Sequence, residues 1–290
     1  MKYLPDDLKR EYDYFIRNHP DIPEINHPLI NLSDVFRAYF ILIHYFTDNS
    51  SSDALEKILP GIRSVDLLAS ALGRQTVSFG GHQKYRDPID ICATLFFGLV
   101  KNHSLNDGNK RTALLILLYQ LQLFGFLPTA PKKDFEKLVL SVAASNLKET
   151  YRGYYRKFKK QNDWEIQVIS FALKKMINKK NNSYHISPTM KDFCAALENQ
   201  GVTYTQENGK IRFSYTIPGK WLFMRETERN YSVSFGGWTR IVGAKTARET
   251  LQALGLYEQF PSYQSLFDDS DPLYELVDNF SEPLRRLKDK

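Results

Sequence analysis

Apolar residues recur every three or four positions through most of the first 180 residues, the spacing expected of helices with one buried face. Polar caps and glycines interrupt this pattern, for example the capping run at residues 31–34 and Gly125 after a long apolar segment. Helices are predicted over residues 7–18, 35–46, 61–72, 89–101, 109–125, 134–148 and 163–178. This part of the chain is therefore expected to be a bundle of helices.

The pattern changes beyond a polar run at residues 179–183, where alternation of apolar and polar residues replaces the helical spacing. Strands are predicted over residues 202–206, 211–216, 221–225 and 231–235, between helices over 189–200 and 244–254, with a final helix from Pro272. The predicted organisation is an N-terminal arm (1–32), a helical domain (33–180) and a smaller α+β domain with a terminal tail (184–290). The fold class expected for the whole chain is mainly α.

Residues 73–88 lie between two predicted helices and follow neither period closely. They are polar, contain the pair Gly80 and Gly81, and alternate weakly around Val77 and Phe79. Adjacent glycines permit the positive φ angles that tight hairpin turns need. The segment is therefore predicted to be a loop or a short hairpin.

The most distinctive stretch is residues 103–113, with the sequence HSLNDGNKRTA. Asp107 and Gly108, flanked by asparagines, favour a tight turn, and the long apolar run that follows predicts a buried helix starting near Asn109. A turn that leads into a helix N-terminus presents backbone N–H groups and the positive end of the helix dipole. The cations at positions 110 and 111 stand against that dipole, and a bound anion would explain both of them.

This stretch resembles the signature of the Fic/Doc (death-on-curing) superfamily in its Doc-like version, whose usual pattern is His-Pro-Phe-x-Asp/Glu-Gly-Asn-Gly/Lys-Arg. His103 and residues 107–111 match that pattern, while Ser104 replaces Pro and Leu105 replaces Phe. The likeness extends over about residues 31–179 and implies a Fic/Doc-type helical bundle there. Leucine fills much of the phenylalanine volume, so we expect a looser site rather than an inactive one.

The resemblance implies a role for most residues of the signature. His103 corresponds to the general base, Asp107 to the Mg²⁺ ligand, and Gly108, Asn109 and Arg111 to the phosphate-binding residues. The residue types suit these roles, because imidazole accepts protons near neutral pH and carboxylate oxygen is a preferred ligand of Mg²⁺.

The family also has a hairpin flap ahead of the signature that aligns the target polypeptide. The segment at residues 73–88 occupies that place. The resemblance therefore assigns a target-aligning role to Val77, Phe79, Gly80 and Gly81.

The residue at position 110 helps to distinguish adenylyl transfer from phosphoryl transfer. In Fic-type adenylyltransferases this position is Gly, and a second Arg follows three residues after the signature Arg, where this chain has Leu114. In Doc-like members the nucleotide binds the other way round and presents its γ-phosphate to the hydroxyl. We therefore expect phosphoryl transfer from Mg²⁺-bound ATP or another NTP, catalysed by His103, Lys110 and Arg111, to a Ser, Thr or Tyr of a protein target.

Three alternatives stay open on the sequence. One is a protein AMP transferase, and another is a degenerate adaptor that transfers nothing. The third is an RNA-binding role for the C-terminal domain, whose helix–strands–helix order weakly resembles the double-stranded-RNA-binding-like fold of HicA-type toxins. Residues 207–210 offer no counterpart to the catalytic His of those toxins, and the cations of this domain are scattered. Nucleic acid is therefore not the expected partner.

Composition and charge narrow the class of protein further. The chain has 290 residues, 42% hydrophobic and 25% charged, with a net charge of +6. Its two cysteines, Cys92 and Cys194, lie far apart in the sequence, which argues against structural zinc and disulfides. The sequence shows no signal peptide and no uninterrupted membrane-spanning run, so a cytoplasmic protein is expected.

Regulation of such a transferase is expected to come from a separate antitoxin, as in toxin–antitoxin systems, or from the C-terminal domain of the same chain. Many family members carry an inhibitory helix with the pattern Ser/Thr-x-x-x-Glu-Gly/Asn. Residues 203–208 (TYTQEN) match this pattern but fall where a strand and turn are predicted, so we interpret the match as chance. Residues 148–160 are basic with interleaved tyrosines, which indicates either a solvated helix face or a docking surface for an acidic partner.

Overall fold

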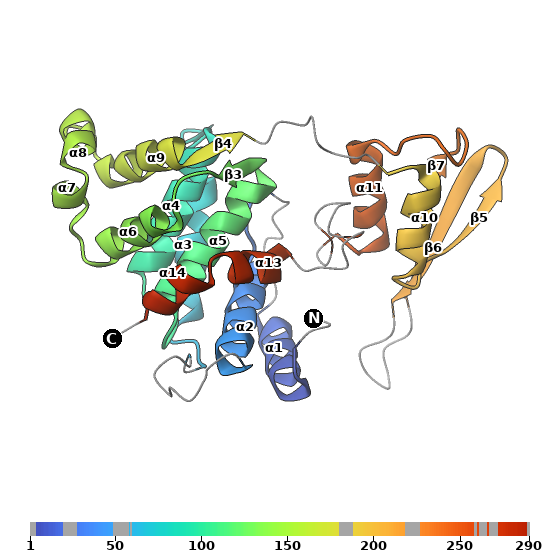
Figure 1. The fold of residues 1–290 in the computed structure, drawn as a ribbon, viewed down its shortest axis with the longest axis horizontal. Coiled ribbons are helices and arrows are strands. Elements are labelled where there is room, and N and C mark those ends of the chain that lie inside the picture. Colours follow the sequence, from blue (N-terminus) through green and yellow to red (C-terminus); the bar gives the residue numbers. More distant parts are fainter. Residues whose placement is uncertain are drawn as a thin grey trace. The chain divides into compact units, whose positions relative to one another are not determined.

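A computed structural model describes residues 4–19, 28–48, 58, 60–179, 188–217, 227–257, 260, 266 and 272–288 of the chain. The chain forms two compact units, one of residues 1–180 together with 273–290 and one of residues 181–272 (Figure 1). The first unit consists mainly of helices, and the second combines helices with a three-stranded antiparallel sheet. The expected fold class, mainly α with a smaller α+β part, is therefore confirmed.

Helix α5 (Asn109–Leu123) is the central helix of the first unit. All of its side chains from position 111 to position 121 are buried, so the helix is enclosed on every side. The helices α2 (Leu32–Asp48), α4 (Pro88–Lys101) and α6 (Lys132–Ala143) pack against it. The first unit also contains α1 (Asp6–Asn18), α3 (Val65–Gly73), the 3-10 helix η2 (Arg74–Thr76), α7 (Leu147–Thr150), α8 (Arg152–Phe158) and α9 (Trp164–Met176).

Two predicted helices end earlier than their apolar patterns indicate. The helix predicted over 134–148 breaks after α6, where Ser145 has a positive φ of 56°, and resumes as the short α7. The helix predicted over 163–178 gives way to β4 (Ile177–Lys179), which pairs antiparallel with β3 (Phe126–Pro128). Strands of three residues have too few side chains to show alternation, so the sequence pattern could not reveal this pair.

A buried amide joins three separate parts of the first unit. The Oε1 atom of Gln75 accepts hydrogen bonds from the backbone N–H of Ile30 at 2.9 Å and from Nε2 of Gln120 at 2.7 Å. Its Nε2 atom donates to the carbonyl oxygens of Ile30 at 2.9 Å and Leu72 at 3.1 Å. Both donors and both acceptors of this amide are therefore satisfied in the core.

The terminal tail was expected to belong to the C-terminal domain, and the structure corrects this. Its helices α13 (Pro272–Asn279) and α14 (Ser281–Arg286) pack in the first unit. Apolar side chains spaced three or four residues apart are buried in that unit's core, namely Leu273, Val277, Phe280, Leu284 and Leu287. This apolar stripe packs against the helical bundle, although the second unit is the part that precedes it in sequence.

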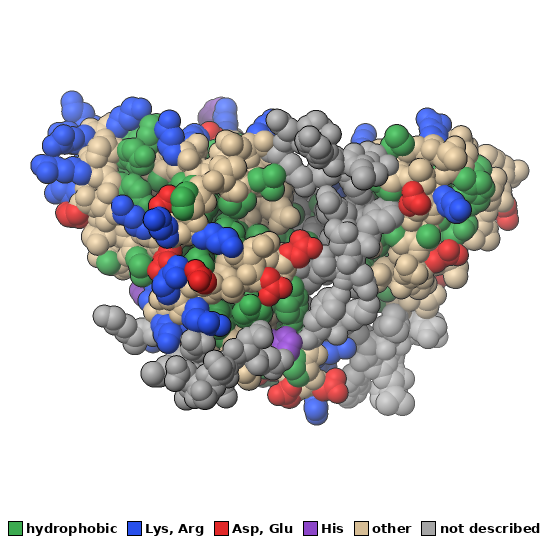
Figure 2. Space-filling view, viewed as in Figure 1, with side chains coloured by type: hydrophobic (Ala, Val, Ile, Leu, Met, Phe, Trp, Pro, Cys, Tyr) green, Lys and Arg blue, Asp and Glu red, His purple; other side chains and the backbone are tan. Residues whose placement is uncertain are grey.

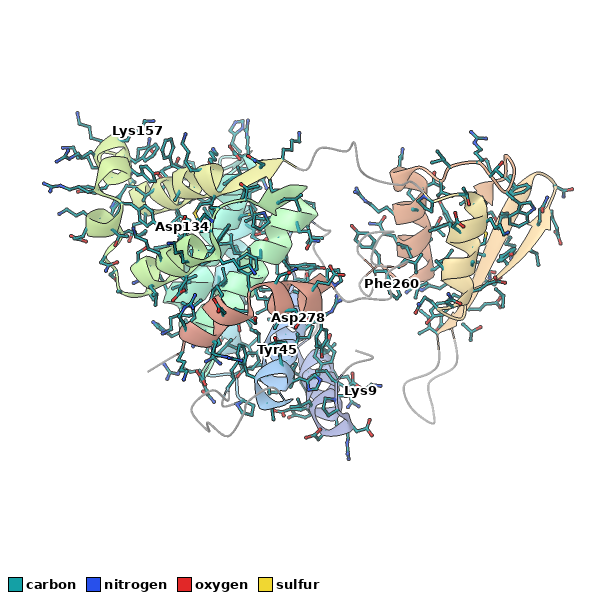
Figure 3. The ribbon with its side chains drawn as sticks, in the orientation of Figure 1. Lys9, Tyr45, Asp134, Lys157, Phe260 and Asp278 are labelled. Carbon is teal, nitrogen blue, oxygen red and sulfur yellow. The ribbon has the colours of Figure 1, made fainter. Side chains whose placement is uncertain are left out.

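Individual contacts hold the tail in place. Phe280 meets Phe135 of α6 edge to face, with 5.7 Å between ring centroids. Tyr45 of α2 lies beside Asp278 of α13 (Figure 3). Burial and the neighbouring Asp278 carboxylate both raise the pKa of Tyr45. The tail is therefore an integral part of the bundle.

The second unit places one face of a sheet against two helices. Its elements are α10 (Met190–Glu198), β5 (Thr203–Glu207), β6 (Lys210–Ile217), β7 (Thr227–Ser234) and α11 (Ala244–Leu254), with strand order β5-β6-β7. This agrees with the predicted helix–strands–helix order, except that the strand expected over 221–225 lies outside the described residues. Residues 203–208 form β5 and its turn, so the string TYTQEN is not helical. No helix in the described part of the chain has the length and apolar character that crossing a membrane requires.

Lys and Arg side chains gather over the end of the first unit that α7 and α8 form (Figure 2). The aromatic side chains of α8 point inward, where Tyr154 and Phe158 both pack edge to face on Phe171 of α9. The ammonium of Lys157 lies 4.4 Å from the centroid of the Phe171 ring. This arrangement is that of an amphipathic helix with a solvated basic face.

We predict that Gln75→Ala lowers the free energy of unfolding by about 3 kcal/mol or more, because it leaves several buried backbone and side-chain groups without partners. Urea unfolding followed by circular dichroism measures this change. Gln83→Ala on the exposed strand β2 (His82–Gln83) serves as the control and should shift stability by less than about 0.5 kcal/mol. Equal stability of the two variants would contradict a structural role for the buried amide.

Candidate active site

The signature loop, residues 102–108 between α4 and α5, is fastened by backbone hydrogen bonds to a neighbouring segment. The carbonyl of Ser104 accepts from the N–H groups of Arg63 at 2.9 Å and Ser64 at 3.1 Å. The N–H of Asn106 donates to the carbonyl of Gly61 at 3.0 Å. The replacement of Pro by Ser104 therefore leaves this part of the loop well anchored.

A second clamp closes the loop on itself. The Asn109 side chain accepts from the Leu105 N–H and donates to the Leu105 carbonyl, both at 2.9 Å. Both residues are buried, with Leu105 only 2% exposed. The leucine thus occupies an interior position, and the buried amide fixes its backbone.

Two residues of the loop have left-handed backbone angles. His103 has φ 47°, and Gly108 at the N-cap of α5 has φ 82°. A Cβ atom on Gly108 would lie 3.2 Å from Ile58 and 3.6 Å from Tyr39, so both the angle and the space favour glycine. Gly108 also has no side chain to cap the first N–H groups of α5. A helix N-terminus without a side-chain cap is the arrangement that the predicted anion site requires.

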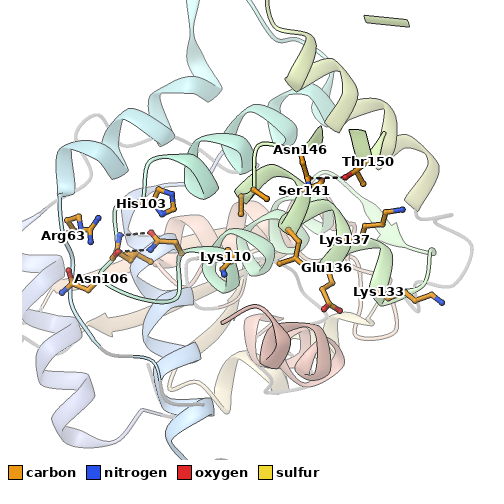
Figure 4. Close-up of a pocket in the computed structure, with 15 residues that line it drawn as sticks. Arg63, His103, Asn106, Lys110, Lys133, Glu136, Lys137, Ser141, Asn146 and Thr150 are labelled. Carbon is orange, nitrogen blue, oxygen red and sulfur yellow. Dashed lines mark hydrogen bonds between the residues drawn. The ribbon is translucent and has the colours of Figure 1, made fainter. Parts of the chain in front are cut away.

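A cavity of about 870 Å³ lies beside this loop (Figure 4). Its lining comes from the signature loop with the start of α5, from the segment before α3, and from α6 and α7. The residues that line it are Arg63, His103, Leu105, Asn106, Asn109, Lys110, Lys133, Glu136, Lys137, Leu140, Ser141, Ala143, Ala144, Asn146 and Thr150. A cavity of this size suits a small-molecule ligand such as a nucleotide.

The structure brings some predicted site residues together and separates others. His103, Asn109 and Lys110 line the cavity. Asp107 and Gly108 are neighbours of the lining without belonging to it. Arg111 is only 2% exposed, and its guanidinium stacks 4.5 Å from the centroid of the Phe46 ring.

Two contacts from the C-terminal tail reach the cavity wall. Lys110 donates a hydrogen bond from Nζ to the backbone carbonyl of Lys288. Nε of Arg286 donates to the Glu136 carboxylate at 2.9 Å, which compensates the negative charge that Glu136 brings to the lining. The other charged residues of the described lining, Arg63, Lys110, Lys133 and Lys137, make it a cationic site. An anionic ligand is therefore favoured.

The predicted flap is a two-stranded hairpin. Strand β1 (Ser78–Phe79) pairs antiparallel with β2, and Gly80 and Gly81 between them both have positive φ, as a tight hairpin turn requires. Phe79 is 92% exposed and Val77 is 42% exposed, and neither lines the cavity. An exposed aromatic side chain beside a short strand edge suits contact with an extended polypeptide.

The sequence reasoning missed the cations at the far side of the cavity. Lys133 and Lys137 come from α6, and their place in the site depends on how α6 packs against α5. A usable signal was present, because Lys133 stands in the first turn of its helix, against the dipole, as Lys110 does. The helix-dipole argument that pointed to Lys110 applies equally to Lys133.

Residues 29–121 match the model of the Fic/DOC family. This segment, about a third of the chain, therefore belongs to the Fic/DOC family. The match covers the elements from α2 to nearly the end of α5, including the flap and the signature loop. Comparison of the chain with curated proteins and with solved structures gave no match.

Membership in the Fic/DOC family identifies the class of reaction. Members transfer groups derived from nucleotides to proteins and typically use a nucleoside triphosphate as co-substrate. The Fic/DOC segment is therefore a transferase domain at the level of the family.

The donor atoms of the loop bear on the metal that the family resemblance implies. No group of three or more His, Cys, Asp and Glu side chains within the described ranges could hold a metal ion. Asp107 is half-buried, and its Oδ1 atom accepts the N–H of Gly108 at 2.6 Å. Mg²⁺ usually takes one or two protein carboxylates and completes its shell with phosphate oxygens and water. A single carboxylate therefore fits Mg²⁺ that arrives with a nucleotide.

We predict that Asn109→Ala lowers the free energy of unfolding by about 2–4 kcal/mol, because it leaves the buried N–H and carbonyl of Leu105 without partners. It should also speed hydrogen exchange at the Leu105 amide. Asn102→Ala is the matched control, since that side chain donates to an exposed backbone carbonyl, and it should cost less than about 1 kcal/mol. Similar losses in both variants would show that the Asn109 clamp does not fix the loop.

Proposed function

We propose that the Fic/DOC domain of this chain transfers the γ-phosphoryl group of a Mg²⁺-bound nucleoside triphosphate to a hydroxyl of a protein target. The observation that carries this proposal is the placement of two residues. Lys110 lines the cavity together with His103, whereas Leu114 is fully buried in the core. The site therefore has a cation where adenylyltransferases have Gly and an apolar side chain where they have their second Arg.

His103 is proposed as the general base. It is exposed at the cavity wall and attached to a loop that backbone hydrogen bonds hold in place. In the reaction, the target hydroxyl gives its proton to the imidazole, and its oxygen forms a bond to the γ-phosphorus. The bond from that phosphorus to the bridging oxygen breaks, and the nucleoside diphosphate leaves with the electron pair.

Lys110 is proposed to neutralise charge on the transferred phosphoryl group. Its ammonium already donates a hydrogen bond to the carbonyl of Lys288. An ammonium has three N–H donors, so this bond is compatible with a further contact to a phosphate oxygen. A preorganised cation beside the developing charge lowers the barrier to phosphoryl transfer.

Asp107 and Arg111 complete the proposed machinery. Asp107 is proposed to hold Mg²⁺, which supplies charge neutralisation between the phosphates when it is bound. Arg111 is proposed to act on the phosphates through its charge, since a buried cation near the start of α5 is less screened than an exposed one. The flap hairpin is proposed to align the target polypeptide.

The second candidate is transfer of AMP. It is favoured by the family, in which this reaction also occurs, and it uses the same base and the same anion site. It places the α-phosphorus at the hydroxyl and needs cations for the β- and γ-phosphates. The buried Leu114 offers none, so phosphoryl transfer is the better supported reaction.

We predict that the wild-type protein labels its target with γ-labelled ATP and leaves it unlabelled with α-labelled ATP. Lys110→Gly should lower γ-phosphoryl transfer about 10²-fold or more, because it removes a charge that stabilises the transition state. Labelling in a cell extract, followed by intact-mass measurement of the labelled protein, distinguishes a phosphate from an AMP adduct. Lys9→Ala on the exposed surface of α1 is the charge-matched control. Label that arrives from the α-phosphate would overturn the proposed reaction and support AMP transfer.

We predict that His103→Ala reduces transfer at least about 10²-fold while the Kd for Mg²⁺-ATP changes less than about threefold. A general base acts in the transition state and contributes little to ground-state binding. Transfer rates and calorimetric titrations, each compared with His19→Ala at the end of α1, measure the two effects. Parallel loss of affinity and transfer would identify His103 as a binding residue.

A further inference from the structure

The wall of the cavity formed by α6 and α7 lies outside the segment that matches the Fic/DOC family. The match ends at residue 121, and α6 begins at Lys132. Most of the lining nevertheless comes from this side, from Lys133 to Thr150. In Figure 4, Lys110 lies between His103 on one side and the labelled residues of α6 on the other. A ligand that contacts both walls therefore extends beyond the signature loop.

Lys133 and Lys137 are available for an anionic ligand. Neither has a carboxylate partner in the described part of the chain, and both are exposed at the wall. Glu136, the acidic residue of the cavity lining, is held by Arg286. The charge of this wall is therefore net positive.

The aromatic neighbour of Lys137 does not act as a counterion. The Lys137 ammonium lies 5.8 Å from the centroid of the Tyr151 ring. Burial, followed by the charge of Asp134 and the proximity of Tyr154, raises the pKa of Tyr151 to about 12, so the phenol stays neutral at physiological pH. A ring face attracts an ammonium weakly and leaves its N–H donors able to bind phosphate.

The same wall combines apolar and polar surface beside the two lysines. Leu140 is 42% exposed although it is a large apolar residue, and Ala143 and Ala144 adjoin it in the lining. Asn146 and Thr150 add amide and hydroxyl groups, joined by a hydrogen bond of 3.2 Å between Thr150 Oγ1 and Asn146 Oδ1. Apolar surface with a few polar groups at its edge is the lining that a nucleoside requires.

We propose that α6 and α7 form the second half of the nucleotide site, in which Lys133 and Lys137 bind the phosphates that are not transferred and the Leu140 surface contacts the nucleoside. The inference rests on the proposed function, since it places the reacting phosphate at His103 and Lys110 in the same cavity. The inference also gives the orientation of the nucleotide, with its reacting phosphate at the signature loop and its nucleoside at α6. It also assigns two binding residues outside the family segment.

The test compares the binding of Mg²⁺-ATP with that of adenosine by calorimetric titration, with no protein target present. The double variant Lys133→Ala/Lys137→Ala should bind Mg²⁺-ATP about tenfold or more weakly than the wild type, because two charge-assisted contacts are lost. Adenosine has no phosphate groups, so its affinity should change much less. The control is Lys132→Ala, which removes a charge from the same helix, and whose ammonium lies over the Phe280 ring and outside the cavity lining. It should change the ATP affinity less than about twofold.

Several outcomes decide against the inference. Wild-type affinity for ATP in the double variant would overturn it, and so would equal weakening of ATP and adenosine binding, which indicates a structural effect. Restored ATP affinity in Lys133→Arg/Lys137→Arg would support it and would show that the positive charges are required. Because binding is measured without transfer, labelling from the α-phosphate would overturn the phosphoryl-transfer proposal while these affinities still decide the role of the lysines.

Discussion

The geometry of the site depends on the fastening of the signature loop at both of its ends. The carbonyl of Ser104 accepts two backbone N–H groups from the segment before α3, and the Asn109 amide holds both backbone groups of Leu105. Buried hydrogen bonds of this kind are expensive to break, because each orphaned group costs about 1–3 kcal/mol. They allow His103 to keep a left-handed backbone angle at a position where it lines the cavity.

The electrostatics of the cavity follow from where its cations are attached. Lys110 stands at the start of the central helix α5, and Lys133 stands at the start of α6, so both oppose the dipole of their own helix. Such positions cost stability unless an anion compensates them. Arg286 neutralises Glu136, which leaves the cavity with a net positive charge along its length. This pattern gives a physical reason for an extended anionic ligand.

The C-terminal tail brings the chain back to the first unit. The chain leaves the helical bundle after residue 180, forms the second unit, and returns with α13 and α14. Five apolar side chains of the tail are buried in the bundle, and its last described residue accepts a hydrogen bond from Lys110. In sequence, the second unit is therefore an insertion between two parts of the first unit.

The sequence by itself determined the local features of this protein. The turn of Asp107 and Gly108, the helix that follows it and the hairpin at Gly80 and Gly81 all appear where residue chemistry placed them, because propensities and turn preferences act over a few residues. The Fic/DOC signature likewise depends on contiguous residues, so the amino-acid order alone is enough to recognise it. Its residue roles follow from the resemblance and stay predictions.

Only the tertiary structure decided which distant segments meet. The pairing of β3 with β4, the burial of Arg111 on Phe46 and the return of the tail to the bundle each join residues that no local pattern connects. Lys133 and Lys137 became site residues only because α6 packs against α5 and turns one edge toward the signature loop. Such contacts depend on the fit of whole apolar surfaces, which sequence spacing within one element does not encode.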